Sequence, residues 1–263
     1  MLKKLLKYDL KWSFKPLIIF YILSIFFAVV TRILGNFDNS FIFIIIDKIC
    51  FGITISMIIN ILINNFMRVW ARTIRNLYKD EAYLTHTLPV TKRTIFLSKV
   101  LTAVITTLVS FIVIVACLAI CLLSKENLQI LKTFMEQTAV FLNSSVSSVI
   151  IVMAITLFFE ILFMIMAGIL GIIIGYRSNN LKTLKSIIYG FLLYMLASTI
   201  SIGILYIAGL FNSEIMKLFT SVDIISASAL KETLYVGIAI YIIYDIIYYL
   251  IGKKVLNKGV NVD

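Results

Sequence analysis

Residues 146–175 read VSSVIIVMAITLFFEILFMIMAGILGIIIG, a stretch whose one charged residue is Glu160. An α-helix rises about 1.5 Å per residue, so about 20 apolar residues span the roughly 30 Å hydrocarbon core of a bilayer. Five further apolar runs of suitable length occur, at residues 17–34, 41–66, 96–123, 187–210 and 233–251. The sequence therefore predicts an all-α integral membrane protein with six transmembrane helices.

The composition of the chain supports this fold class. Of the 263 residues, 61% are hydrophobic and 14% are charged, and the mean hydropathy is +1.05. An ordinary soluble domain is roughly 45–50% apolar and about 25% charged. With only 2 prolines and 11 glycines, the chain has no linker-like segment. We therefore expect one membrane domain over residues 17–251.

The basic residues are distributed unevenly between the apolar runs. Segments 1–16, 67–99, 176–186 and 252–263 hold 18 of the 24 lysines and arginines. Because cytoplasmic segments carry the excess of basic residues, these four are expected in the cytoplasm. Both termini then face inward, and residues 252–263 form a cytoplasmic tail. The net charge of +11 is explained by topology, so no nucleic-acid partner is expected.

Residues 1–16 carry an amphipathic helical pattern. Five lysines project from about a third of a helical wheel, namely Lys3, Lys4, Lys7, Lys11 and Lys15. This pattern predicts an interfacial helix on the inner leaflet, with membrane lipid as its partner and with Pro16 as the point where the chain turns into the first span. Asp9 interrupts the pattern, because it falls on the apolar side.

The longest cytoplasmic segment, residues 67–95, carries two further helical signatures. Four cations recur every three or four residues, namely Arg68, Arg72, Arg75 and Lys79. If the second span continues as a helix, these cations form one basic stripe along it. The stripe is expected to be a solvated face near anionic lipid. Asp80 is expected to cap a short helix that Pro89 ends.

This short helix carries apolar side chains beside its acidic beginning. Tyr83, Leu84 and Leu88 occur within six residues of one another. Interface energy concentrates in such apolar and aromatic anchors. The segment is therefore a candidate docking peg for a cytoplasmic partner.

Residues 80–90, DEAYLTHTLPV, with Ser98-Lys99 after them, resemble the cytoplasmic loop of type-2 ATP-binding-cassette permeases. The predicted layout of interfacial helix, six spans and inward termini is similar to that family as well. The resemblance implies that this coupling loop contacts a separate ATPase subunit through Asp80, Glu81, Tyr83, Leu84, Thr85, His86, Leu88 and Pro89. Many relatives have glycine where Ala82-Tyr83 stands before Leu84-Thr85 here, which leaves the subfamily and the substrate open.

The resemblance also implies an assembly. The chain contains no Gly-x-x-x-x-Gly-Lys-Ser/Thr loop, so ATP and Mg are expected on the partner subunit, with no cofactor and no catalytic residue on this chain. A second permease subunit, identical or different, completes the transporter. Export of a peptide, lipid or drug-like compound is therefore expected. The isoleucine- and lysine-rich composition indicates a bacterial protein, so the expected location is a bacterial plasma membrane.

A secondary transporter or channel is the alternative. Charged groups within spans are costly and mark ion or proton paths, so Glu160 and Asp245 are candidates for a translocation path. An intramembrane enzyme is disfavoured, because His86 is the only histidine and no metal-ligand set accompanies it. The cysteines are expected to be structural.

The fourth apolar run also contains a helix-packing signal. Ala167, Gly171 and Gly175 place a small residue at every fourth position. Such spacing allows two helices to approach closely, either within one subunit or between subunits.

Overall fold

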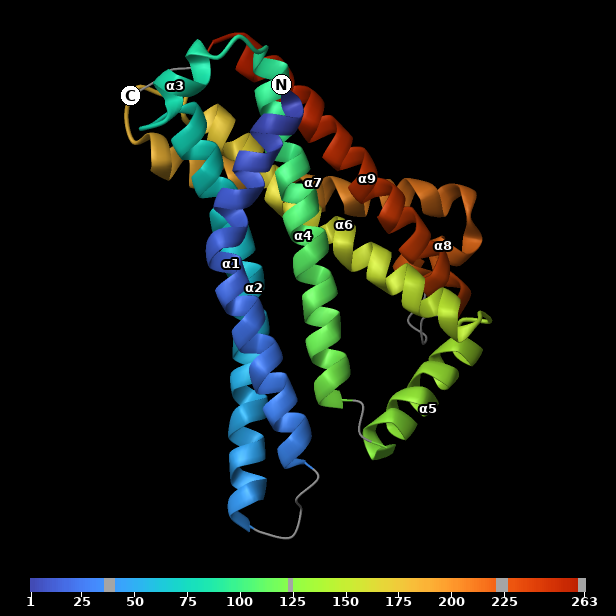
Figure 1. The fold of residues 1–263 in the computed structure, drawn as a ribbon. Helices are drawn as coiled ribbons and strands as arrows, with labels where there is room; N and C mark the ends of the chain where they lie inside the picture. Colours follow the sequence, from blue (N-terminus) through green and yellow to red (C-terminus); the bar gives the residue numbers. More distant parts are fainter. Residues whose placement is uncertain (36–40, 123–124, 221–226, 260–263) are drawn as a thin grey trace. The chain divides into compact units, whose positions relative to one another are not determined.

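The computed structural model describes residues 1–35, 41–122, 125–220 and 227–259. These residues form helices and no strand (Figure 1). In chain order the helices are α1 (Leu2–Leu34), α2 (Phe41–Leu77), α3 (Ala82–Thr87), α4 (Lys92–Leu122), α5 (Lys125–Phe141), α6 (Val146–Gly175), α7 (Lys182–Phe211), α8 (Ser213–Thr220) and α9 (Ala227–Asn257). The prediction of an all-α chain with six helices long and apolar enough to cross a membrane is confirmed, by α1, α2, α4, α6, α7 and α9.

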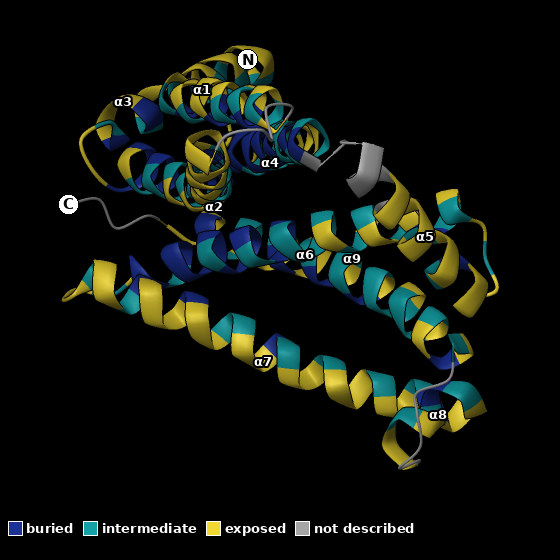
Figure 2. Cartoon of the chain, turned by 90° about the horizontal axis from the view of Figure 1, so that it is seen from below, coloured by how far each residue is buried: buried dark blue, intermediate teal, exposed yellow. Residues whose placement is uncertain are grey.

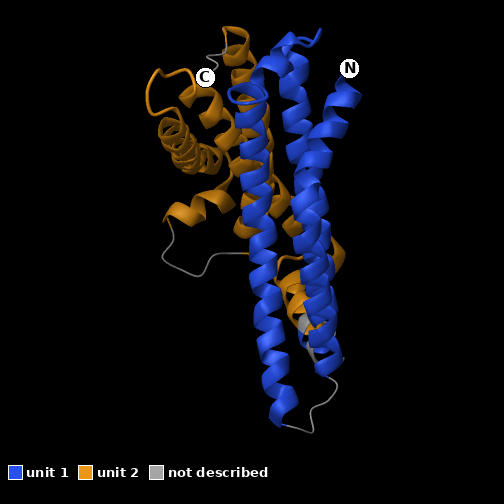
Figure 3. Cartoon of the chain, turned by 60° about the vertical axis from the view of Figure 1, so that its left-hand side comes forward, with its two compact units in different colours: residues 1–131 blue, residues 132–263 orange. Residues whose placement is uncertain are grey.

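The chain divides into two compact units, residues 1–131 and residues 132–263 (Figure 3). In the first unit α1 packs against both α2 and α4, and α3 contacts α2. In the second unit α6 packs against α7 and α9, while α8 contacts the same two helices. The predicted coupling loop lies in the first unit, and the predicted acidic path residues and small-residue motif lie in the second.

Much of the surface of the long helices is exposed (Figure 2). On α1 the exposed residues include large apolar ones, whereas several of the buried residues are polar. Ile22 and Phe26 of α1 are exposed, whereas Ser24 is fully buried. Tyr21 of the same helix shares a 2.7 Å hydrogen bond with the Ser110 hydroxyl of α4. This distribution suits helices that contact hydrocarbon, where polar groups must find partners inside the protein.

Helix α1 continues through Pro16, which differs from the turn expected there. Proline lacks an N–H and clashes with the preceding turn, at a cost of about 3 kcal/mol in a helix interior. Just beyond it, Leu17 and Tyr21 are buried against Ile61 of α2, and this packing offsets the cost. Residues 1–16 are thus the beginning of α1 and not a separate helix, although all five of their lysines are exposed. Residues 260–263 of the predicted tail lie outside the described residues.

The small residues of α6 lie against α7 of the same chain. A Cβ atom added to Gly175 would clash with the backbone nitrogen of Ser186. One added to Gly171 would clash in the same way with the backbone nitrogen of Gly190. Ala167, one turn earlier, is buried as well. The motif therefore brings the backbones of α6 and α7 together.

Candidate functional site

The predicted coupling loop forms a short helix with two different faces. Ala82 and Thr85 of α3 are buried toward the protein, whereas Tyr83 and Leu84 are 70% and 73% exposed. Leu88, which ends the helix in extended conformation immediately before Pro89, is 43% exposed. Three apolar side chains therefore project from a helix whose other face is held in place.

Glu81 fastens the beginning of α3 to α2. Its Oε2 accepts hydrogen bonds from Arg72 Nη1 at 2.5 Å and from Asn76 Nδ2 at 2.6 Å. Its backbone carbonyl accepts a 2.9 Å bond from the hydroxyl of Thr85, one turn into α3. Glu81 itself stands at the N-cap of α3, so the expectation that Asp80 caps this helix is wrong. Its carboxylate is engaged by Arg72 and Asn76, which leaves the cap without a side-chain hydrogen bond.

The far end of α3 is fastened as well. His86 Nε2 lies 3.1 Å from the carbonyl oxygen of Leu77, the last residue of α2. A carbonyl only accepts, so the Nε2–H of His86 donates this bond. Both ends of α3 are therefore tied to α2 by hydrogen bonds.

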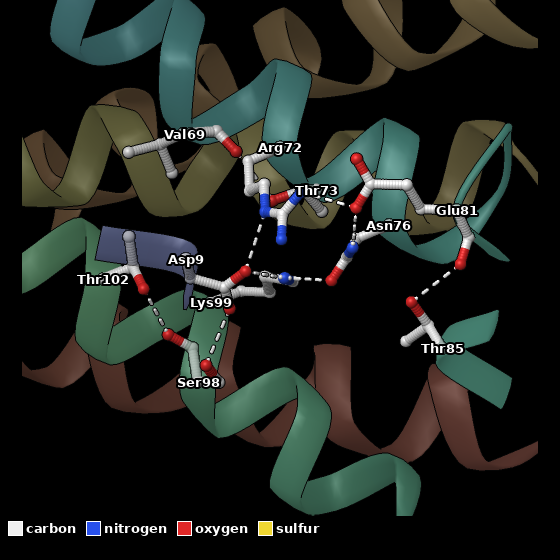
Figure 4. A network of polar contacts seen from close by, with 10 residues as sticks. All are labelled: Asp9, Val69, Arg72, Thr73, Asn76, Glu81, Thr85, Ser98, Lys99 and Thr102. Carbon is white, nitrogen blue, oxygen red and sulfur yellow. Dashed lines mark hydrogen bonds and ion pairs between the residues drawn. The ribbon is translucent and has the colours of Figure 1, made fainter. Parts of the chain in front are cut away.

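A buried ionic network continues from Glu81 into α1 and α4 (Figure 4). Asp9 of α1 accepts hydrogen bonds from Arg72 Nε at 2.8 Å, from Lys99 Nζ at 2.7 Å and from the hydroxyl of Ser98 at 2.7 Å. Lys99 also donates to Oδ1 of Asn76. One turn of α1, the C-terminal part of α2 and the first turns of α4 thus meet at one carboxylate.

The network is balanced in charge and largely closed to solvent. Asp9 and Lys99 are each 2% exposed, Arg72 is 8% exposed, and only Glu81 reaches solvent appreciably. Two cations face two carboxylates. Because removing a charge from water is costly, each buried ion depends on its partners. The network therefore holds α1, α2, α4 and the beginning of α3 in one arrangement.

Sequence reasoning missed most of this network. Arg72 was expected on a solvated face and is buried instead, so that part of the predicted basic stripe is wrong. The available signal was Asp9, an acidic residue on the apolar side of an otherwise basic helix. A carboxylate in such a place requires a buried cation.

The remaining predicted loop residues lie at the surface. Asp80 is exposed and its carboxylate lies 3.7 Å from the guanidinium of Arg75. Pro89 is exposed after the end of α3. Thr91 caps α4, because its hydroxyl accepts a 3.3 Å bond from the backbone N–H of Thr94.

The two acidic residues predicted for a translocation path lie on α6 and α9. Glu160 is partly buried on α6. Both carboxyl oxygens of Asp245 on α9 are shielded from solvent and find no hydrogen-bond donor among the described residues. Over the same residues, no group of three or more histidine, cysteine, aspartate or glutamate side chains is placed to hold a metal ion.

Comparisons of this chain with protein-family models, with curated proteins and with solved structures found no match. The central feature of the site is a set of exposed apolar side chains, Tyr83, Leu84 and Leu88, on a short segment that hydrogen bonds fasten to the C-terminal part of α2.

Proposed function

We propose that this chain is the permease subunit of an ATP-driven transporter, and that α3 docks onto a separate cytoplasmic ATPase subunit. The observation that carries the proposal is the contrast within α3. Tyr83 and Leu84 are largely exposed while Ala82 and Thr85 of the same helix are buried. Large apolar side chains held out into water at the centre of a small surface are typical anchors of a protein interface.

The anchoring of α3 supports a role in transmitting force. A docking element that drives a transporter must move the membrane helices when its partner moves. Glu81 connects α3 to Arg72 of α2, and Arg72 connects onward to Asp9 of α1. A displacement of α3 therefore acts directly on two of the apolar helices.

The proposed complex has two permease subunits and two ATPase subunits that carry ATP and Mg. We place this chain in a bacterial plasma membrane, with the first turns of α1 at the inner leaflet and both termini in the cytoplasm. This orientation follows from the excess of basic residues in the segments that include α3. The proposed direction is export, of a peptide, lipid or drug-like compound.

The proposal is tested by replacing Tyr83 and Leu84 together with alanine. Anchors of this kind contribute roughly 2 kcal/mol or more each to binding, so loss of both is expected to weaken the affinity for the ATPase by about 700-fold. Membrane insertion is expected to be unchanged, because neither side chain lies in an apolar span. The measurement is pull-down of a candidate ATP-binding-cassette ATPase co-expressed with this chain, together with ATP-dependent transport in proteoliposomes.

The matched control replaces Ile130 and Phe134 of α5 with alanine. These side chains are also exposed, at 68% and 59%, but belong to a segment expected on the outer side. ATPase binding and transport should be unaffected by this change. If the Tyr83/Leu84 variant binds the ATPase and transports as the control does, α3 is not the docking element.

A further inference from the structure

Three guanidinium groups surround the indole ring of Trp12. The guanidinium carbons of Arg68, Arg72 and Arg75 lie 5.3, 5.4 and 6.0 Å from the ring centroid. The face of an indole attracts cations, and tryptophan is the strongest of the aromatic residues in this respect. Three positively charged side chains from successive turns of α2 therefore lie around this one ring.

The neutralisation of these three charges is unequal. Arg72 pairs with Asp9 and Glu81 in the buried network. Arg75 has one exposed carboxylate, Asp80, at 3.7 Å, which contributes little in water. Arg68 has no carboxylate partner within the described part of the chain. Two guanidinium groups next to one ring thus have little or no anionic compensation.

The neighbouring surface of α1 adds more positive charge. Lys15 follows Trp12 by three residues and Lys11 precedes Lys15 by four, which are the spacings of neighbours on a helix surface. Both lysines are exposed, and neither forms an ion pair with the residues that the structure describes. The surface around Trp12 therefore carries four cations, from Arg68, Arg75, Lys11 and Lys15, against the single carboxylate of Asp80.

The position of this surface relative to the apolar runs indicates which ligand it binds. Arg68 follows the apolar run 41–66 by two residues, and Trp12 precedes the apolar run 17–34 by five residues. Both helices therefore leave the hydrocarbon here, at the depth where tryptophan rings and basic side chains meet lipid headgroups. Guanidinium groups bind phosphate oxygens in a bidentate manner, which an ammonium cannot do.

We propose that Trp12, Arg68 and Arg75, with Lys11 and Lys15 at the edge, form a binding site for the phosphate headgroup of an anionic phospholipid. The site is a defined contact of one headgroup, beyond the general attraction of a basic surface to an anionic leaflet. It is independent of the function proposed for α3. Its occupation would join the beginning of α1 to α2 through a third component.

The test uses the purified full chain in detergent and the double variant Arg68→Gln/Arg75→Gln. Native mass spectrometry measures how tightly phosphatidylglycerol and phosphatidylcholine are retained. Wild type is expected to prefer phosphatidylglycerol. A cation near an anionic lipid surface changes binding roughly fivefold, so the double variant should bind phosphatidylglycerol about 25-fold more weakly.

The matched control is Lys3→Gln/Lys4→Gln, which removes the same charge from α1. These lysines precede Trp12 by eight or nine residues, roughly 12 Å along the helix, which exceeds the Debye length of about 8 Å at physiological ionic strength. Phosphatidylglycerol binding should change less than about threefold. An equal loss in both double variants would show diffuse attraction and overturn the site.

Two further measurements keep the result interpretable. Thermal unfolding of each variant is compared with that of wild type. If the double variant does not fold, the single variant Arg68→Gln replaces it, because Arg68 has no carboxylate partner among the described residues. The single variant should bind phosphatidylglycerol about fivefold more weakly. Inorganic phosphate at the concentration of the lipid should not displace phosphatidylglycerol. Displacement by phosphate alone would mean that the site binds free phosphate, and the lipid assignment would be wrong.

Discussion

Replacing Asp9 with asparagine is expected to destabilise the first unit by about 3–5 kcal/mol, because it leaves Lys99 buried without a counter-charge. Among the residues that the structure describes, Asp9 is the one carboxylate that Lys99 contacts, at 2.7 Å, whereas Arg72 keeps its second partner, Glu81. An asparagine has the same shape and one acceptor oxygen, so the loss reports charge more than packing. The measurement is the free energy of unfolding in mixed micelles, followed by circular dichroism.

The matched control for this variant is Asp80→Asn. Asp80 also pairs with an arginine of α2, but both side chains are exposed, and exposed pairs contribute about 0–1 kcal/mol. Adding Lys99→Met to the Asp9 variant removes the unpaired cation, so the double variant should be more stable than Asp9→Asn alone. Equal stability of the Asp9 and Asp80 variants would contradict the structural role of the network.

The second large effect is expected where α6 and α7 touch. Replacing Gly171 and Gly175 together with alanine adds two Cβ atoms, each of which would clash with a backbone nitrogen of α7. The obstructing atoms are backbone, so the helices must separate. Overpacking of this kind costs about 1–3 kcal/mol per site, and the double variant should lose about 2–6 kcal/mol of unfolding free energy. SDS-induced unfolding of the purified chain measures this loss.

A control of identical chemistry is available in the same unit. A Cβ added to Gly203 of α7 or Gly237 of α9 would meet, apart from the nearby backbone of its own helix, no atom of the described residues within 4 Å. Their replacement by alanine should be neutral or slightly stabilising, because alanine favours the helix over glycine by about 1 kcal/mol. If the two double variants lost stability equally, close packing at Gly171 and Gly175 would not be what holds α6 against α7.

The number of the apolar helices was predictable because it depends only on local sequence. A bilayer requires about 20 apolar residues in a row for each helix, and residues 146–175 meet this requirement without reference to any other part of the chain. The end of α3 was predictable for a similar reason, since Pro89 disfavours helix at the residue before it. The continuation of α1 through Pro16 was not, because burial of Leu17 against α2 offsets a local cost.

The sequence by itself therefore determined an all-helical chain with six apolar helices, a short helix between Asp80 and Pro89, and small residues spaced for close packing on α6. Only the tertiary structure decided which charges lie inside. The bonds of Asp9 to Arg72, Ser98 and Lys99 join residues 63, 89 and 90 positions apart. Helical periodicity places a side chain on a face of its own helix but does not say which helix covers that face. The apolar faces of membrane helices resemble one another, so they do not select their neighbours. Which helices pack together depends instead on where small residues let two backbones come close, and on the need of each buried ion for a partner of opposite charge.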